Sequence, residues 1–172
     1  MQRVLVMGCS GSGKTTFARA LADTLGIPLV SLDRLFWQPG WREPAMEDFT
    51  AAVMREAEKP AWVIDGNYSR YGAAALRRAR ADTVVWFDLP RWRCLLGVLH
   101  RIATGYGTVR PEMAPGCPER LDWAFLRYVW TYRAVQRPKD LSFFTALRAD
   151  QQLVTFTARA QTATFLAEAG AV

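Results

Sequence analysis

A glycine-rich motif near the N-terminus constrains the fold of this chain more than any other feature of its sequence. Residues 8–15 match the pattern Gly-x-x-x-x-Gly-Lys-Ser/Thr in full. The apolar run of residues 4–7 comes before the motif, and Phe17, Leu21 and Leu25 follow it at helical spacing. We therefore predict a buried strand, a phosphate-binding loop and a helix in direct succession.

Each fixed position of the motif has a physical task. Gly8 and Gly13 permit backbone conformations that turn successive N–H groups inward around a phosphate. The N-terminus of the following helix adds unpaired N–H groups and a favourable dipole. We expect Lys14 to reach the β- and γ-phosphates of a nucleotide and the Thr15 hydroxyl to ligate Mg²⁺. The residues predicted to bind the nucleotide are Gly8, Cys9, Ser10, Gly11, Ser12, Gly13, Lys14, Thr15 and Thr16.

The remaining pattern favours one α/β domain. The chain has 172 residues, 51% of them hydrophobic, which is enough for an ample single core. Short apolar segments predict strands at residues 3–7, 28–32, 62–65, 83–89 and 153–157, with helices between them. This alternation predicts a five-stranded parallel sheet with helices on both faces, which is the three-layer α/β/α P-loop NTPase fold. Ligands are then expected at the carboxyl ends of the strands.

Charge and cysteine content indicate which ligands and which cellular compartment suit the protein. The net charge of +6 is carried almost wholly by arginine, with nineteen arginines against three lysines, which suits phosphate-bearing ligands of any size. Cys9, Cys94 and Cys117 are odd in number and lack Cys-x-x-Cys spacing, which favours a reducing compartment without structural zinc. No apolar stretch approaches the ~18 residues of a membrane span, and we expect a cytoplasmic protein without a signal peptide.

A segment rich in glycine and proline interrupts the regular pattern. Residues 104–120 contain three glycines and three prolines, which disfavours a helix. Arginines flank this segment, and we expect it to form a mobile flap, or lid, between two helices.

A long helix is predicted after the lid, from about residue 119 to residue 136, with Pro138 stopping it. One side of this helix carries Arg120, Trp123, Arg127 and Trp130. These arginines could bind phosphate while the tryptophans stack on a base. Alternatively, the tryptophans pack against the rest of the protein, as tryptophans at helical spacing usually do.

Carboxylates at the ends of predicted strands are the candidates for metal binding and catalysis. Asp65 is our choice for the Mg²⁺ ligand because Gly66 follows it and lets backbone and ligand approach closely. Asp88, before Leu89 and Pro90, is interpreted as part of a strand-to-helix junction. Asp33 follows the second strand, and we expect it to orient or deprotonate an acceptor hydroxyl. Trp37 and Trp41 either wall the acceptor pocket or pin a loop.

These residues resemble a known group of enzymes. The phosphate-binding loop, Asp65-Gly66, the Phe-Asp-Leu-Pro of residues 87–90 and Arg101 resemble adenylate-kinase-like small kinases. The resemblance implies a P-loop kinase fold with a lid at about residues 104–120 and ATP as the phosphoryl donor. It also implies Arg101, Arg110 and Arg120 as charge clamps on the phosphates.

Three longer stretches, residues 32–41, 63–69 and 110–120, are similar to DNA topology modulation proteins of the FlaR type. One departure from the adenylate kinases concerns the helix after Pro90. Gly97 stands there in the position of the first of two lid-facing arginines, and only Arg101 matches.

Two functions are therefore considered. The first is ATP- and Mg²⁺-dependent phosphoryl transfer to a small acceptor, either a nucleotide or a hydroxyl-bearing metabolite. In this function Thr15 and Asp65 hold magnesium, and the predicted catalytic residues are Lys14, Asp33, Arg101, Arg110 and Arg120. The alternative is an ATP-binding regulator that acts on DNA, although the sequence holds no recognisable DNA-binding module. The Asn-Lys-x-Asp motif of GTPases is missing, which favours adenine by default.

Overall fold

The computed structural model of the protein describes residues 1–68 and 71–171. Ser69, which ends the motif of residues 63–69, lies outside the described residues, as does Arg70. The elements follow one another as β1 (Arg3–Gly8), α1 (Lys14–Leu25), β2 (Leu29–Ser31), α2 (Leu32–Phe36), α3 (Met46–Ala57), β3 (Trp62–Asp65), α4 (Ala74–Arg80), β4 (Thr83–Phe87), α5 (Arg91–Gly105), α6 (Trp123–Val135), α7 (Arg137–Phe144), β5 (Gln152–Phe156) and α8 (Gln161–Ala169).

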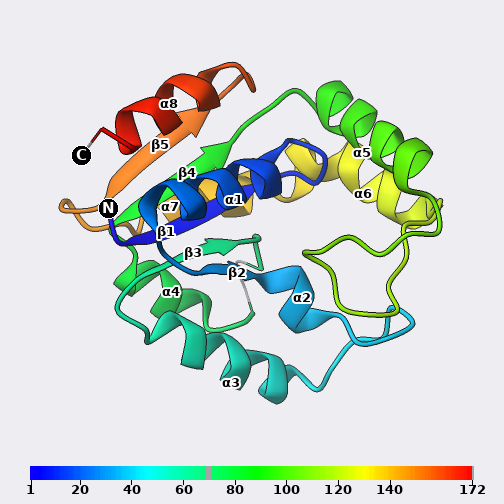
Figure 1. The fold of residues 1–172 in the computed structure, drawn as a ribbon, viewed down its shortest axis with the longest axis horizontal. Coiled ribbons are helices and arrows are strands. Elements are labelled where there is room, and N and C mark those ends of the chain that lie inside the picture. Colours follow the sequence, from blue (N-terminus) through cyan, green and yellow to red (C-terminus); the bar gives the residue numbers. More distant parts are fainter. Residues whose placement is uncertain (69–70, 172) are drawn as a thin grey trace.

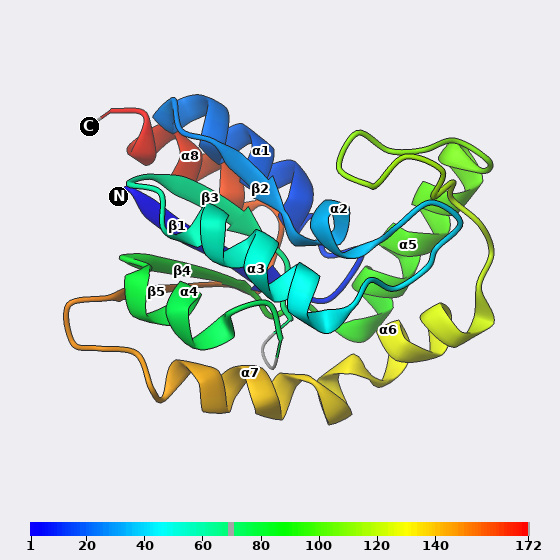
Figure 2. The same ribbon diagram turned by 90° about the horizontal axis from the view of Figure 1, so that it is seen from below.

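The five strands form one sheet in the order β2-β3-β1-β4-β5, and every neighbouring pair is parallel. Helices α1 and α8 lie on one face of this sheet, and α3, α4 and α7 lie on the other (Figures 1 and 2). The predicted three-layer α/β/α fold is confirmed. Parallel strands need crossovers that cover both faces, which explains why the inner strands β1, β3 and β4 are almost entirely buried, whereas the edge strand β5 is largely exposed.

The central strand β1 shows how the two faces are filled. Val4 and Val6 point into the core that α1, α5 and α6 complete, whereas Leu5 and Met7 point into the core beneath α3 and α4. All four side chains are almost completely buried. Because β1 is central and rigid, its carboxyl end is a firm base for the phosphate-binding loop that follows.

The predicted helix after the lid begins too early, although its end near residue 136 is confirmed. Helix α6 begins only at Trp123, where the Asp122 side chain caps it by accepting a hydrogen bond from the Phe125 N–H at 3.0 Å. A second helix, α7, starts at Arg137 with Pro138 in its first turn. Proline is tolerated there because a first-turn residue has no helical partner for its N–H.

The segment between α5 and α6 has no helix, as predicted. It folds back on itself, because the Gly107 N–H donates to the Glu119 carbonyl at 2.9 Å and the Glu119 N–H donates to the Thr108 carbonyl at 2.8 Å. It also contacts the segment after β2, where the Trp41 indole N–H donates to the Pro118 carbonyl at 3.2 Å. The segment therefore lies packed over the carboxyl end of β2.

Across the described parts of the chain, no helix has both the length and the apolar character needed to cross a membrane.

Candidate active site

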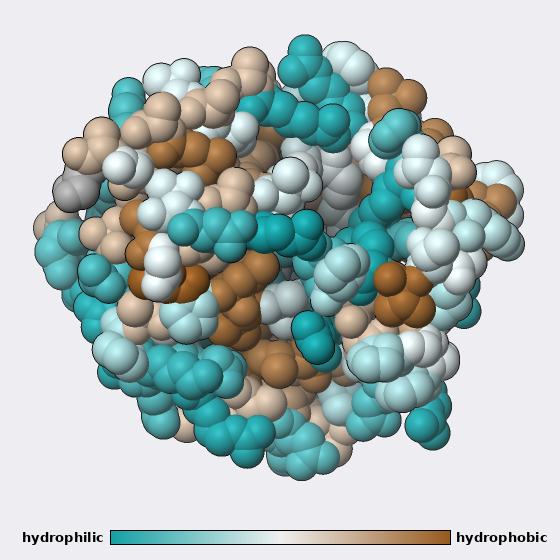
Figure 3. All heavy atoms as spheres, in the orientation of Figure 1, coloured by the Kyte–Doolittle hydropathy of each residue, from teal (hydrophilic) through white to brown (hydrophobic). Residues whose placement is uncertain are grey.

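A cavity of about 1410 Å³ opens at the carboxyl ends of the strands. The molecular face drawn in Figure 3 is hollowed near its middle, and hydrophilic and hydrophobic side chains alternate around the hollow. All five predicted catalytic residues line this one cavity: Lys14, Asp33, Arg101, Arg110 and Arg120. They come from five separate places in the chain, so the fold brings together what the sequence spreads over more than a hundred residues.

The loop of residues 8–15 forms one end of the cavity. Gly8, Gly11 and Gly13 have φ angles of 144°, 77° and 102°, a region that side chains disfavour. A Cβ atom at Gly11 would lie 2.2 Å from the Cys94 carbonyl oxygen of α5, so this position requires glycine for space as well. Gly13 caps α1 without a side-chain hydrogen bond, which leaves the first-turn N–H groups available to a phosphate.

The predicted nucleotide-binding residues divide into two sets. Gly8, Ser10, Gly11, Gly13, Lys14, Thr15 and Thr16 line the cavity. Cys9 and Ser12 are buried instead, and the Cys9 thiol faces the Val129 carbonyl oxygen at 3.8 Å. Any part that Cys9 and Ser12 play in nucleotide binding therefore belongs to their backbone.

Lys14, Thr15 and Asp65 meet directly behind the loop. The Thr15 hydroxyl donates to Asp65 Oδ2 at 2.6 Å, and Lys14 Nζ lies 3.9 Å from Asp65 Oδ1. Burial raises the pKa of Asp65, and the nearby Lys14 charge opposes that rise. Asp65 is thus a buried carboxylate that needs positive charge beside it.

These residues fit a magnesium ion. Asp65 Oδ1 is buried without a hydrogen-bond partner within the described residues, and the Thr15 hydroxyl lies next to the same carboxylate. Mg²⁺ commonly binds through one or two protein oxygens together with nucleotide phosphates and water. Asp88, the candidate that the sequence analysis set aside, accepts from Arg137 through both of its oxygens, at 2.8 Å at the closest. It links the end of β4 to the start of α7.

Asp33 stands at the start of α2, across the cavity from the loop. The Tyr68 hydroxyl donates to Asp33 Oδ1 at 3.0 Å. Burial and the neighbouring Asp33 charge raise the pKa of Tyr68, so its hydroxyl stays protonated and remains a donor. Tyr68 has a φ of 41°, a strained value for a residue with a large side chain. Sequence reasoning missed Tyr68, although it follows the Asp-Gly-Asn of residues 65–67.

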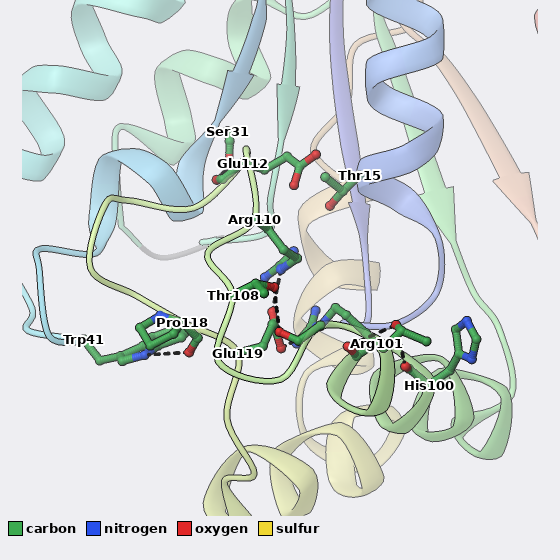
Figure 4. A network of polar contacts seen from close by, with 12 residues as sticks. Thr15, Ser31, Trp41, His100, Arg101, Thr108, Arg110, Glu112, Pro118 and Glu119 are labelled. Carbon is green, nitrogen blue, oxygen red and sulfur yellow. Dashed lines mark hydrogen bonds and ion pairs between the residues drawn. The ribbon is translucent and has the colours of Figure 1, made fainter.

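Two of the three arginines around the lid share one carboxylate, and the third has other partners. Arg101 of α5 and Arg110 of the lid both donate to the buried carboxylate of Glu119, as Figure 4 shows. Arg120 pairs with Asp122 at 3.4 Å, and its guanidinium lies 5.4 Å from the centre of the Trp41 ring. Trp37 and Trp41 both line the cavity and also pack against the lid residues Met113 and Cys117.

A second polar network was not foreseen in the sequence. The Asn67 side chain accepts from the Gly8 N–H at 2.8 Å and donates to the Tyr132 hydroxyl at 2.8 Å. Tyr132 in turn donates to Asp140. Asp140 is buried, and this burial raises its pKa to about 6. The network joins the first residue of the phosphate-binding loop to α6 and α7.

Gly97 is explained by its contact with the loop. A Cβ atom at this position would lie 2.2 Å from the Gly11 carbonyl oxygen and 2.6 Å from Arg159 Nη2. Arg159 precedes α8, and its Nε donates to the Ser12 carbonyl at 3.0 Å while its Nη2 donates to the Gly11 carbonyl at 2.5 Å. A side chain at residue 97 has no room, and a cation from the far end of the chain stands beside the loop instead.

Trp123 and Trp130 are not core residues. Trp123 is 75% exposed and Trp130 is 45% exposed. The Arg91 guanidinium lies 4.3 Å from the centre of the Trp130 ring, which is a cation–π contact on the surface. Neither tryptophan lines the cavity at the phosphate-binding loop.

Comparison with known proteins supports the fold. A family model described as the ATPase family associated with various cellular activities (AAA) matches residues 4–88. No curated protein matches the chain. Three solved structures resemble it over most of its length at low sequence identity, and each carries a kinase name.

The first is shikimate kinase from Bacteroides thetaiotaomicron, at 19% identity and a TM-score of 0.59, covering 97% of this chain and 95% of that one. The second is a gluconokinase from Sinorhizobium meliloti 1021, at 19% identity and a TM-score of 0.55, covering 99% of this chain and 90% of that one. The third is shikimate kinase from Acinetobacter baumannii in complex with shikimate, at 16% identity and a TM-score of 0.57, covering 98% of this chain and 90% of that one. These likenesses show an α/β P-loop NTPase fold. The comparisons give no support to a DNA partner.

Proposed function

We propose that this protein is a kinase that transfers the γ-phosphoryl group of ATP to a hydroxyl group of a small acceptor, with Mg²⁺. The observation that carries the proposal is the single cavity with two chemically distinct ends. A phosphate-binding loop lines one end, and the hydrogen-bonded pair of Asp33 and Tyr68 lines the other. The kinase names of the structural neighbours, two of them for hydroxyl-bearing acids, point in the same direction.

The donor end supplies positioning and positive charge. Backbone N–H groups of the loop and Lys14 would hold the phosphates, while Arg101 and Arg110 approach from the lid side of the same cavity. Phosphoryl transfer needs such charge neutralisation more than covalent help from the protein. Thr15 and Asp65 would hold Mg²⁺, which would supply positive charge to neutralise the phosphates.

The acceptor end supplies a proton acceptor. An acceptor hydroxyl next to Asp33 would give its proton to the Asp33 carboxylate as its oxygen forms a bond to the γ-phosphorus. The bond between that phosphorus and the bridging oxygen to the β-phosphate breaks, and ADP leaves. The Tyr68 hydroxyl holds one Asp33 oxygen at 3.0 Å, which leaves the other oxygen for the acceptor.

We further propose that the chain is one kinase-like domain in which residues 104–120 act as the lid. The aromatic rings of Trp37 and Trp41 would wall the acceptor end beneath it, since both side chains line the cavity and contact the lid. Closing such a lid excludes water from the transferring phosphoryl group.

The test is ADP formation from ATP and Mg²⁺ across a panel of hydroxyl-bearing metabolites and nucleotides. Wild-type protein should form ADP only with a suitable acceptor, and Lys14→Ala should lose that activity. Lys59→Ala is the matched control, because Lys59 forms a surface ion pair with Glu56 and takes no part in the cavity. Equal ADP formation by wild-type protein and Lys14→Ala across the panel would contradict the proposal.

A further inference from the structure

A single buried carboxylate joins two arginines from different parts of the chain. Glu119 is only 4% exposed. Its Oε2 accepts from Nε of Arg101 on α5 at 3.1 Å, and its Oε1 accepts from Nε of Arg110 in the lid at 2.5 Å. Figure 4 shows Arg101 and Arg110 both reaching this carboxylate.

The backbone holds Glu119 as firmly as its side chain does. The Glu119 N–H and carbonyl bind Thr108 and Gly107, which places a residue from the end of the lid beside residues at its start. The carboxylate is therefore not a free surface group that happens to meet an arginine. A buried charge is costly unless it is paired, and here each oxygen has its own cation.

Both arginines use Nε for this contact, which has a geometric consequence. The two terminal nitrogens of each guanidinium have no hydrogen-bond partner within the described residues, and both arginines line the cavity that contains Lys14. The Arg101 guanidinium also lies 5.6 Å from the centre of the Phe125 ring. Burial lowers the pKa of Arg101 first, and the nearby Arg110 charge lowers it further, while Glu119 opposes both effects. Glu119 thus allows two positive groups to share a confined space.

We propose that Glu119 is a positioning residue that holds Arg101 and Arg110 side by side, with their terminal nitrogens directed at the γ-phosphate of bound ATP. This inference rests on the proposed function and adds a residue that itself does not touch the nucleotide. Removal of Glu119 would leave both arginines in the cavity but separate and misdirected. The loss of affinity should appear for a nucleoside triphosphate, which has a γ-phosphate, and not for a diphosphate.

The opposite role makes the opposite prediction. If Glu119 sequestered the arginines, a nucleotide would have to displace it, and its removal would strengthen triphosphate binding. The measurement that separates the two roles is the ratio of affinities for a non-hydrolysable ATP analogue and for ADP. Isothermal titration calorimetry in the presence of Mg²⁺ gives both values without any acceptor or turnover.

The variant Glu119→Gln keeps the shape of the side chain and removes its charge. We expect it to bind the analogue on the order of tenfold more weakly, as for the loss of one charge-assisted contact, with ADP affinity unchanged within about twofold. Glu119→Asp, which keeps the charge but withdraws it by one methylene, should show part of this loss. The matched control is Glu56→Gln, which removes an ion-paired carboxylate outside the cavity.

A double-mutant comparison tests whether Glu119 acts through the arginines. In a background of Arg101→Gln and Arg110→Gln, the further change Glu119→Gln should alter the analogue-to-ADP ratio by less than about twofold. Thermal unfolding of each variant confirms that it is folded before titration. An undiminished effect in that background, an equal loss for both nucleotides, or a stronger analogue affinity in Glu119→Gln would each overturn the inference. Failure of wild-type protein to bind the analogue would overturn the proposed function, and this inference with it.

Discussion

The contact between Gly97 and the phosphate-binding loop predicts how Gly97→Ala changes the stability of the protein. Two opposing free-energy terms decide whether the variant is more or less stable. Gly97 lies inside helix α5, where a change to alanine ordinarily stabilises a helix by about 1 kcal/mol. Here the added methyl carbon would lie 2.2 Å from the Gly11 carbonyl oxygen. Carbon–oxygen contacts require about 3.3 Å, so helix and loop must separate by about 1 Å. Overpacking of this kind costs roughly 1–3 kcal/mol, which outweighs the gain in helix propensity.

Gly97→Ala should therefore be less stable than wild-type protein by roughly 1 kcal/mol in urea unfolding. The larger effect falls on activity, because a displacement of about 1 Å in a catalytic loop can lower turnover on the order of 100-fold. Gly105→Ala is the matched control in the same helix, since its methyl would meet the Thr108 hydroxyl at 3.3 Å and Glu119 Cγ at 3.9 Å, with no contact as close as the one at Gly97. The reasoning is refuted if Gly97→Ala is more stable than wild type and turns over normally.

Three further predictions concern carboxylates. Asp33→Asn should lower acceptor-dependent ADP formation by roughly 10²–10⁴-fold with ATP affinity retained, and an unchanged steady-state rate would remove the proton-accepting role of Asp33. Asp65→Asn should raise the Mg²⁺ concentration needed for half-maximal activity. Asp88→Asn should leave that concentration unchanged and lower the stability of the protein, because it frees Arg137. A reversed pattern would assign the metal to Asp88. Burial raises the pKa of Asp140 from 3.8 to about 6, so its contribution to stability is present in full below pH 3.8 and is lost as the pH rises to about 6. In urea unfolding, the difference in stability between wild type and Asp140→Asn should change between pH 3.8 and about 6 and stay constant at higher pH. A difference that does not depend on pH would contradict this.

Local spacing along the chain was enough to predict the strand, loop and helix of residues 3–25. The glycines, Lys14 and Thr15 lie within eight consecutive residues, so their arrangement depends on one strand, one loop and one helix. The inner strands β1, β3 and β4 were predictable for the same reason, because a strand buried on both faces is a short apolar run. The choice of Asp65 over Asp88 also followed from local sequence and stays a prediction. Asp65 contacts Thr15, whereas Asp88 contacts Arg137.

The partners of the functional side chains were not predictable in this way. Asp33 meets Tyr68, and Glu119 meets Arg101, through contacts between segments 18 or more residues apart. Only the packing of the lid and of the loop after β3 decides such pairs. The misplaced start of α6 has the same origin. Glu119 is held by Gly107 and Thr108 of the lid, whereas the Asp122 carbonyl accepts a helical hydrogen bond from the Leu126 N–H.

Helix α7 shows a limit of a different kind. Pro138 was interpreted as the end of a helix, but a proline in a first turn marks a beginning equally well. The two cases differ in whether the chain can turn sharply before the proline, and that depends on the neighbours of Gln136. Tertiary packing against the α3 and α4 side of the sheet, where Phe143 and Phe144 are buried, favours the second helix.

The central claim is that the γ-phosphoryl group goes to an organic hydroxyl and not to water. ATP labelled in the γ-phosphate, incubated with the protein, Mg²⁺ and an acceptor that supports ADP formation, tests this directly. The account predicts that label appears in the organic acceptor in step with ADP, and that Lys14→Ala and Asp33→Asn both abolish the transfer. Label that appears only in inorganic phosphate, at the same rate with or without acceptor, would contradict the account and indicate an ATPase.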